Sequence, residues 1–163
     1  MAFLAGPAGE FGRSAEGLIV AWSPENRAKA FLAAMSMTRP ARVDELLALG
    51  VDPNTADPWG RTALHMAVRY AYNGEAAALA IVQTLLAAGA DLHAADEEGF
   101  TALKHAAVYG YPGLLRFLIA AGADVNHRTP EGQSAIGMIE CCASIKNRRK
   151  RVVKLLEQAG GVR

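Results

Sequence analysis

The sequence predicts an all-α solenoid, in which helix-turn-helix units stack side by side and short β-turn fingers join one unit to the next. Three observations support this fold class. Residues 96–124 contain two helical apolar faces with a break between them, and the same spacing recurs elsewhere in the chain. A glycine closes the second helix of each copy, as expected where a helix ends in a left-handed residue. The chain holds four copies, which are enough to bury a continuous core.

Residues 96–124 serve as the template for the other copies. The first helix follows Gly99 and Thr101, and Gly110 and Pro112 interrupt it. The second helix ends at Gly122. Both helices carry apolar residues at the spacing of one helical face, namely Leu103, Ala106 and Ala107 in the first and Leu114, Leu115, Leu118 and Ile119 in the second.

The copy that precedes the template needs two different offsets. Its second helix matches after a shift that places Gly122 on Gly89, but its first helix matches only when Thr101 falls on Thr62. The second shift is longer than the first, so about six extra residues lie between the two helices, near residues 70–75. We expect them to lengthen the first helix and its turn and to place Tyr70 and Tyr72 at the edge of the stack.

The first copy is recognised by Pro40 and Gly50, which align with Pro112 and Gly122 of the template. Ser23 is the expected N-cap of its first helix, because Pro24 suits the first helical position. Its second helix is expected to run from about Pro40 to Gly50.

The fourth copy begins at Gly132 and closes at Gly160, with about five extra residues near 144–150. Glu157 stands where the template has Ile119, so this face is expected to meet water and to end the array. We predict a loosely ordered tail over residues 1–22, whose Leu18, Ile19, Val20 and Trp22 could fold over the first repeat. A repeat domain follows over 23–163, with repeats at approximately 24–56, 57–95, 96–128 and 129–162.

Composition excludes few functions. The formal net charge is +1, so no overall field selects nucleic acid or a membrane. The two cysteines, Cys141 and Cys142, are adjacent on a predicted helix and poorly placed to bridge each other, which favours a reducing, cytoplasmic setting. The start of the chain lacks the basic residues of a secretory signal, although an exported protein whose signal has been removed stays an alternative. We expect a monomer with no cofactor, no metal and no membrane span.

The segments Gly60 to Ala67 and Leu85 to Asp91 resemble the ankyrin repeat, a motif of about 33 residues built from a β-turn and two helices. The resemblance covers roughly residues 24–162. Ala63 and Ala102 replace the proline of the family's Thr-Pro-Leu-His signature, and Lys104 replaces its histidine. The resemblance implies L-shaped units whose fingers and first helices form a concave surface that binds other proteins.

Residues of the repeat signature, such as Thr62, Leu64 and Gly89, are expected to be structural, so function should lie at other positions on the concave side. Aromatic and arginine side chains dominate binding hot spots, and Trp59, Phe100, Tyr70 and Tyr109 are expected to line up along one side. The alternative is that Phe100 or Tyr109 packs against a neighbouring finger or helix. The candidate partner-binding residues are Trp59, Arg61, Met66, Arg69, Tyr70, Glu97, Glu98, Phe100, His105, Tyr109, Glu131, Gln133 and Met138.

The four histidines do not indicate catalysis. His65 stands at the signature histidine, which the resemblance implies is hydrogen-bonded to the neighbouring turn. His105 lies one position further and is expected to face the groove as a contact. His93 and His127 fall in connecting turns, and no Cys or His pair has zinc-finger spacing.

The favoured hypothesis is a non-catalytic module that binds a partner protein, as an adaptor, an inhibitor or an immunity-type regulator. One alternative is that the basic run Lys146 to Arg151 binds nucleic acid or an acidic partner, or serves a nuclear import receptor. A second alternative is an enzyme that uses Cys141 or Cys142 as a nucleophile, although no oriented base can be named for either thiol.

Overall fold

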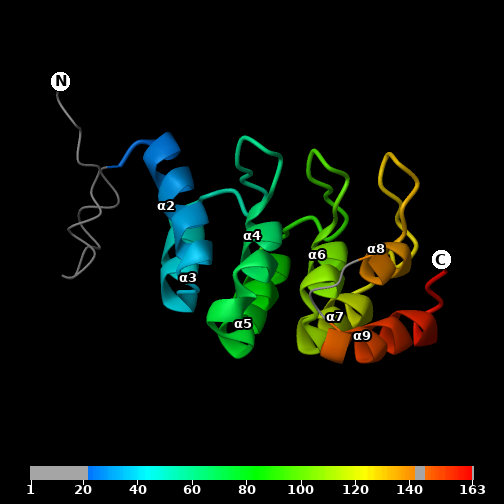
Figure 1. The fold of residues 1–163 in the computed structure, drawn as a ribbon. Coiled ribbons are helices and arrows are strands. Elements are labelled where there is room, and N and C mark those ends of the chain that lie inside the picture. The colour runs from blue at the N-terminus through cyan, green and yellow to red at the C-terminus, as the bar shows by residue number, and fades with distance from the viewer. Residues whose placement is uncertain (1–21, 142–145, 163) are drawn as a thin grey trace, which may run out of the picture.

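The computed structural model describes residues 22–141 and 146–162 (Figure 1). Over these ranges the regular elements are helices, and β-pairing is limited to the isolated bridges Ala56 with Thr62 and Ala95 with Thr101. The predicted all-α repeat architecture is confirmed. The elements are α2 (Pro24–Ser36), α3 (Pro40–Ala48), α4 (Ala63–Arg69), the 3-10 helix η1 (Ala71–Asn73), α5 (Glu75–Ala87), α6 (Ala102–Tyr109), α7 (Pro112–Ala120), α8 (Ala135–Cys141) and α9 (Lys146–Gln158).

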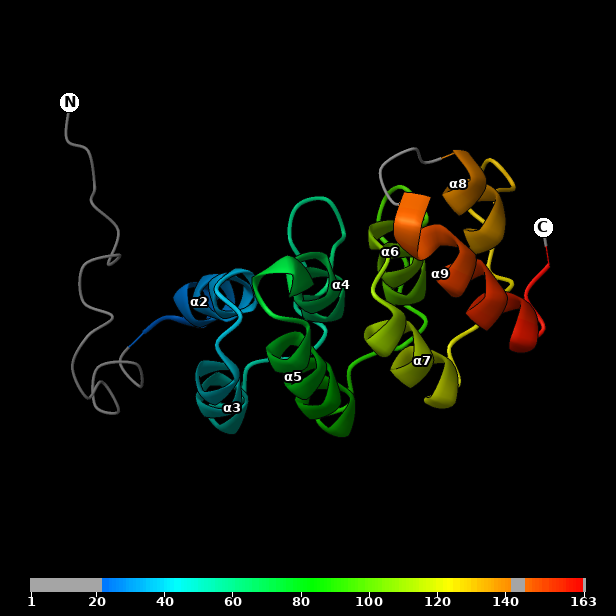
Figure 2. The ribbon, with the colours of Figure 1, turned by 60° about the horizontal axis from the view of Figure 1, so that its bottom comes forward.

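The helices form two layers, as Figure 2 shows most clearly. The first helices of the repeats, α2, α4, α6 and α8, pack against one another in sequence order, and α3, α5, α7 and α9 form the second row. Each first helix also packs on its own second helix. The three loops before α4, α6 and α8 project from one side of the stack as hairpin-like fingers (Figure 1).

The core runs continuously through the stack because every repeat contributes the same apolar faces. Alanines of the first helices, such as Ala67, Ala106 and Ala107, are fully buried and let neighbouring helices approach closely. Larger side chains from the second helices, such as Leu85 and Leu118, fill the space between the layers. Each repeat therefore buries its apolar face against its neighbours, as in other solenoids.

The first repeat begins as predicted. Ser23 is the N-cap of α2 and its hydroxyl accepts a hydrogen bond from the Asn26 backbone N–H at 3.3 Å. Trp22 is half-buried against the core, and the Arg42 guanidinium lies 5.9 Å from the centroid of its ring. Arg42 stands where the third repeat buries Leu114, so the first repeat places a cation beside an aromatic ring at this position.

The predicted glycine ends are confirmed. Gly89 and Gly122 have φ angles of 91° and 94°, in the left-handed region that glycine adopts without a Cβ penalty. At the other end of the array Glu157 is exposed, in agreement with the expectation that this face meets water.

The extra residues of the second repeat lengthen the turn after its first helix, as predicted, but do not lengthen the helix itself, so that part of the prediction was wrong. Helix α4 ends at Arg69, and the additional residues form η1 and four further residues at the start of α5, which has 13 residues against nine in α7. Tyr72 is exposed, as expected at the edge of the stack, whereas Tyr70 is half-buried.

This insertion connects two repeats through Glu75, the first residue of α5. Its Oε1 atom accepts hydrogen bonds from the backbone N–H groups of Gly113 at 2.9 Å and Leu114 at 3.2 Å. These donors lie in the first turn of α7, where backbone N–H groups lack helical partners and a negative charge is favourable. Gly113 leaves room for the carboxylate, since a Cβ there would lie 2.7 Å from Oε1.

Candidate protein-interaction surface

Each of the first two fingers is closed by an aspartate at its base. Oδ1 of Asp57 accepts backbone hydrogen bonds from Trp59 and Arg61, at 2.9 and 3.0 Å. Oδ1 of Asp96 accepts the equivalent bonds from Glu98 and Phe100, at 3.1 and 2.8 Å. Short polar side chains that hydrogen-bond the backbone two residues ahead are typical of tight turns. The same aspartate thus gives both fingers the same backbone shape.

The third finger uses a hydroxyl for this purpose. The Oγ1 atom of Thr129 accepts a hydrogen bond from the Gln133 backbone N–H at 3.3 Å. Thr129 itself is buried. Finger 1 (57–61), finger 2 (96–100) and finger 3 (129–133) therefore have equivalent geometry although their sequences differ.

The fingers also contact one another. The backbone N–H of Glu97 donates to the Trp59 carbonyl oxygen at 3.2 Å, which joins finger 1 to finger 2. Gly99 packs so closely on finger 3 that a Cβ at this position would overlap Cδ of Pro130. The three tips consequently form one continuous row.

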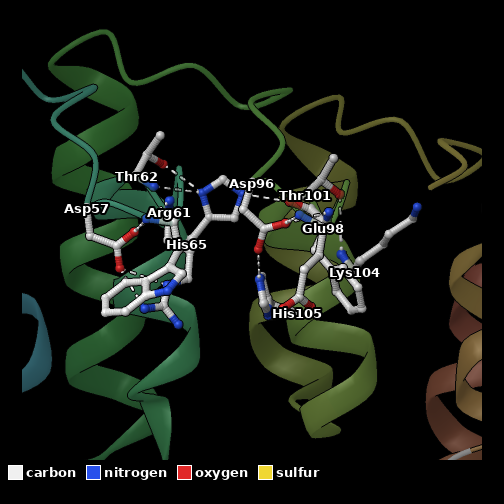
Figure 3. Close-up of polar contacts among 11 residues, drawn as sticks. Asp57, Arg61, Thr62, His65, Asp96, Glu98, Thr101, Lys104 and His105 are labelled. Atoms are coloured by element: carbon white, nitrogen blue, oxygen red, sulfur yellow. Dashed lines mark hydrogen bonds and ion pairs between the residues drawn. The ribbon is translucent and has the colours of Figure 1, made fainter. Parts of the chain in front are cut away.

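Buried donors on the first helices α4 and α6 bind the backbone of fingers 2 and 3. Nδ1 of His65 accepts from the Thr62 backbone N–H at 3.1 Å, so the ring proton is on Nε2, which donates to the Phe100 carbonyl oxygen at 2.9 Å (Figure 3). This is the bond to the neighbouring turn that the family resemblance implies. Burial lowers the pKa of His65, which keeps the ring neutral.

Lys104 performs the equivalent role one repeat later. Its Nζ atom donates to the Gln133 carbonyl oxygen at 3.2 Å, although the residue is only 1% exposed. Burial lowers the pKa of Lys104 because the ammonium loses water. The replacement of the signature histidine by lysine therefore preserves a link between first helix and finger while changing its chemistry.

Asp57 and Asp96 differ in what their second carboxylate oxygen binds (Figure 3). Oδ2 of Asp57 pairs with the Arg61 guanidinium at 2.7 Å, and that guanidinium lies 4.6 Å from the centroid of the Trp59 ring. Burial alone would raise the pKa of Asp57, but the hydrogen bonds from Arg61 and from the finger backbone outweigh it and lower the pKa.

In finger 2 the corresponding oxygen points into the protein. Oδ2 of Asp96 accepts a hydrogen bond from Nε2 of His105 at 3.0 Å. His105 is 6% exposed, and its ring lies edge-on to His65 and stacked with Tyr109. Burial lowers the pKa of His105 to about 4, although the bond to Asp96 works in the opposite direction.

The expectation that His105 faces the groove was therefore wrong. Asp96 has Phe100 where Asp57 has Arg61, so the carboxylate has no guanidinium within its own finger and takes its donor from the helix below. Phe100 and Tyr109 are half-buried and lie 5.2 and 6.0 Å from the His105 ring, which agrees with the alternative that they pack against their neighbours. Tyr70 contacts Tyr72 at 5.9 Å.

The remaining candidates fall into two groups by exposure. Trp59 is 59% exposed, and the polar finger residues Glu97, Glu98, Glu131 and Gln133 are exposed as well. Those that are half-buried, on finger 1 or on the first helices, are Arg61, Met66, Arg69, Tyr70 and Met138.

Three residues that organise the fingers, Asp57, Asp96 and Lys104, were not among the predicted functional residues. A signal for the two aspartates was present, because each precedes a helix-capping threonine, Thr62 or Thr101, by five residues. For Lys104 the signal was its alignment with His65 at the signature-histidine position, although a lysine side chain is ordinarily exposed.

The thiol and basic-run hypotheses lie largely outside the described residues. Cys141 ends α8, but its side chain and all of Cys142 are not described, and in the basic run only Lys150 and Arg151 have described side chains, both exposed. Among the described residues, no group of three or more His, Cys, Asp or Glu side chains could hold a metal ion. Nor does any described helix have the length and apolar character needed to cross a membrane.

Comparison with known proteins agrees with this architecture. The family model for ankyrin repeats matches residues 30–129 in three copies. Among curated proteins, none matches the chain.

Proposed function

Because the chain belongs to the ankyrin-repeat family, whose repeats generally mediate protein–protein interactions, we propose that it is a non-catalytic module that binds a partner protein through its finger tips and the adjoining concave surface. It acts as an adaptor, inhibitor or regulator by occupying that partner. The observation that carries the proposal is Trp59, a large aromatic side chain that is 59% exposed at the tip of a rigid finger.

Two features of finger 1 support Trp59 as an anchor. Its backbone N–H is bound by Asp57, and Arg61 lies against its ring, so the side chain is held in place before any partner arrives. A pre-ordered anchor loses little conformational entropy on binding. Tryptophan and arginine are also the residues that most often dominate the binding energy of an interface.

A photo-crosslinking experiment tests this proposal. The full chain carries a photoreactive phenylalanine analogue in place of Trp59 in one version and in place of Gln83 in the other, because Gln83 is exposed on the outer helix α5. We expect a protein in source cells that crosslinks from the finger and not from α5. The purified partner should then bind Trp59→Ala at least about tenfold more weakly than wild type, as hot-spot residues do.

Tyr72→Ala is the matched control, because Tyr72 is an aromatic residue that is 68% exposed and follows α4, whereas Trp59 precedes it. The control should bind like wild type. A partner that crosslinks from α5, or that tolerates Trp59→Ala as well as Tyr72→Ala, would refute the finger surface as the binding site.

The exposed Lys150 and Arg151 support the second candidate, binding of an acidic partner or nucleic acid through the basic run. Such binding would weaken steeply with salt. A variant with glutamine in place of all five basic residues of the run Lys146 to Arg151 that retains the full salt dependence of partner binding would dismiss it.

A further inference from the structure

We infer that the segment of the partner that crosses the finger tips is cationic and extended, an inference that rests on the proposed function and specifies the chemistry of its ligand. The first step is the Trp59 ring itself. Arg61 lies over one side of the ring at 4.6 Å, so the structure already contains one guanidinium bound by this indole. Tryptophan is the aromatic side chain that attracts cations most strongly.

The ring retains room for a second cation. Trp59 is 59% exposed even with Arg61 over its ring, so a large part of the side chain stays open to a further cation. Arg61 does not repel such a cation strongly, because its own charge is matched by Asp57 at 2.7 Å.

The second step is the charge beside Trp59. Glu97 follows directly in the row, bound by its backbone N–H to the Trp59 carbonyl oxygen, and its side chain lies next to Gly60. Glu98 and Glu131 occupy the position of Trp59 in fingers 2 and 3, and all three glutamates are exposed. Within the described part of the chain, none of these carboxylates takes part in an ion pair.

The net charge of the whole row of fingers is also negative. Residues 57–61, 96–100 and 128–133 contain five acidic side chains and two arginines, which leaves a net charge of −3 although the chain as a whole carries +1. One arginine is Arg61, and the other, Arg128, donates to the Gly132 carbonyl oxygen at 2.7 Å. A partner segment that brings positive charge complements this surface and is attracted to it from a distance.

The third step is spacing. Neighbouring first helices are packed side by side, and packed helices are separated by about 8–10 Å. A peptide in the extended polyproline II conformation advances about 3.1 Å per residue and points every third side chain to the same side, so every third residue meets the next finger. Lysines or arginines three residues apart would therefore reach Trp59, Glu98 and Glu131 in turn.

The test uses the full chain labelled with ¹⁵N and a short peptide with lysine at every third position and serine or threonine elsewhere. The chain has only two tryptophans, Trp22 and Trp59, so the indole N–H signal of Trp59 is identified by its loss in Trp59→Phe. We expect the peptide to shift this signal and the backbone signals of Glu97, Glu98 and Glu131, with an affinity that falls as salt is raised.

The decisive variant is Glu97→Gln, Glu98→Gln, Glu131→Gln, which keeps the size of each side chain and removes its charge. Three exposed charge contacts together predict a loss of about tenfold in peptide affinity. Glu157→Gln, an exposed glutamate on α9, serves as the control and should bind as wild type does. A peptide of the same composition with its lysines clustered at one end should bind more weakly than the spaced peptide.

Three results would overturn the inference: no shift at the fingers, equal affinity for wild type and the triple glutamine variant, or no preference for the spaced peptide. Failure here is distinguishable from failure of the proposed function. A crosslinked partner that requires Trp59 but tolerates the triple glutamine variant would retain the finger surface and refute only the cationic ligand.

Discussion

Fingers 1 and 2 have the same backbone turn, but the second carboxylate oxygen of the aspartate binds a different partner in each. In finger 1, Asp57 binds Arg61 at the surface and steadies an exposed Trp59. In finger 2, Asp96 binds the buried His105 and ties the finger to α6. Two substitutions between equivalent positions, Arg61 to Phe100 and Met66 to His105, account for the difference. The same turn can thus hold an exposed tryptophan or bind to the buried helix, depending on which donor its aspartate meets.

Removal of the two aspartates should give the largest contrast. Asp96→Ala leaves His105 buried without its acceptor and two finger N–H groups unpaired, so we expect a loss of about 3 kcal/mol in the free energy of unfolding. Asp57→Ala also leaves two finger N–H groups without this acceptor, but Arg61 can turn to water, so a smaller loss of about 1 kcal/mol is expected. Urea unfolding followed by circular dichroism measures both values. Equal losses would mean that the Asp96–His105 pair contributes no more to stability than the Asp57–Arg61 pair.

Acid should lower the stability of the protein through His105, which binds Asp96 of finger 2. The pKa of His105 is about 4 in the folded protein against an ordinary 6.5, so the unfolded chain binds more protons than the folded chain between these two values. The stability that the neutral ring contributes is complete above about pH 6.5 and is lost as the pH falls towards 4, by an amount of about 2–3 kcal/mol. The buried His65 adds to the same slope, since its pKa is also lowered.

Unfolding experiments at several pH values test this slope. His105→Asn should show a flatter dependence on pH than wild type, whereas His93→Asn, at an exposed position in a connecting turn, should retain the wild-type slope. Identical slopes for all three proteins would remove His105 as the source of acid sensitivity.

Glycine substitution should also destabilise the two fingers to different extents, with a smaller difference in the free energy of unfolding. Gly99→Ala forces a side chain into the left-handed region at φ 75° and onto Pro130, so we expect a loss of about 2–3 kcal/mol. Gly60→Ala has a similar φ of 71° but its nearest neighbour would be 3.2 Å away, and about 1 kcal/mol is expected. Thermal unfolding ranks the variants. A smaller loss at Gly99 would show that fingers 2 and 3 can move apart freely.

Trp59→Ala should change stability least of all, by less than about 0.5 kcal/mol, because the ring is exposed. Partner binding should nevertheless fall. A large drop in melting temperature would instead place Trp59 in the packing of finger 1.

The repeat architecture was accessible from the sequence because it depends on local, recurring signals. The spacing of Leu103, Ala106 and Leu118 and the glycines after each second helix identify the helices without any knowledge of long-range contacts. Ser23 and Pro24 likewise predicted the start of the first helix, because an N-cap residue acts on the backbone only a few residues away.

The site was less predictable because it depends on which residue satisfies a particular buried atom. His105 occupies a groove-facing register, and its burial is explained by its bond to Oδ2 of Asp96 and by the rings of Phe100 and Tyr109 packed against it. The extra residues of the second repeat were located correctly but assigned to the wrong helix, since their count does not reveal which neighbour they extend. In both cases the outcome is set by partners that are distant in sequence or in an adjacent repeat.

The carboxylate of Glu75 has a consequence for protein design. A designer who deleted the extra residues of the second repeat to restore a uniform period would remove Glu75, which holds the first turn of α7 in the next repeat. The regularised chain would look more like an ideal array yet be joined less firmly in its middle. In this protein the interruption of the period fastens its two halves together.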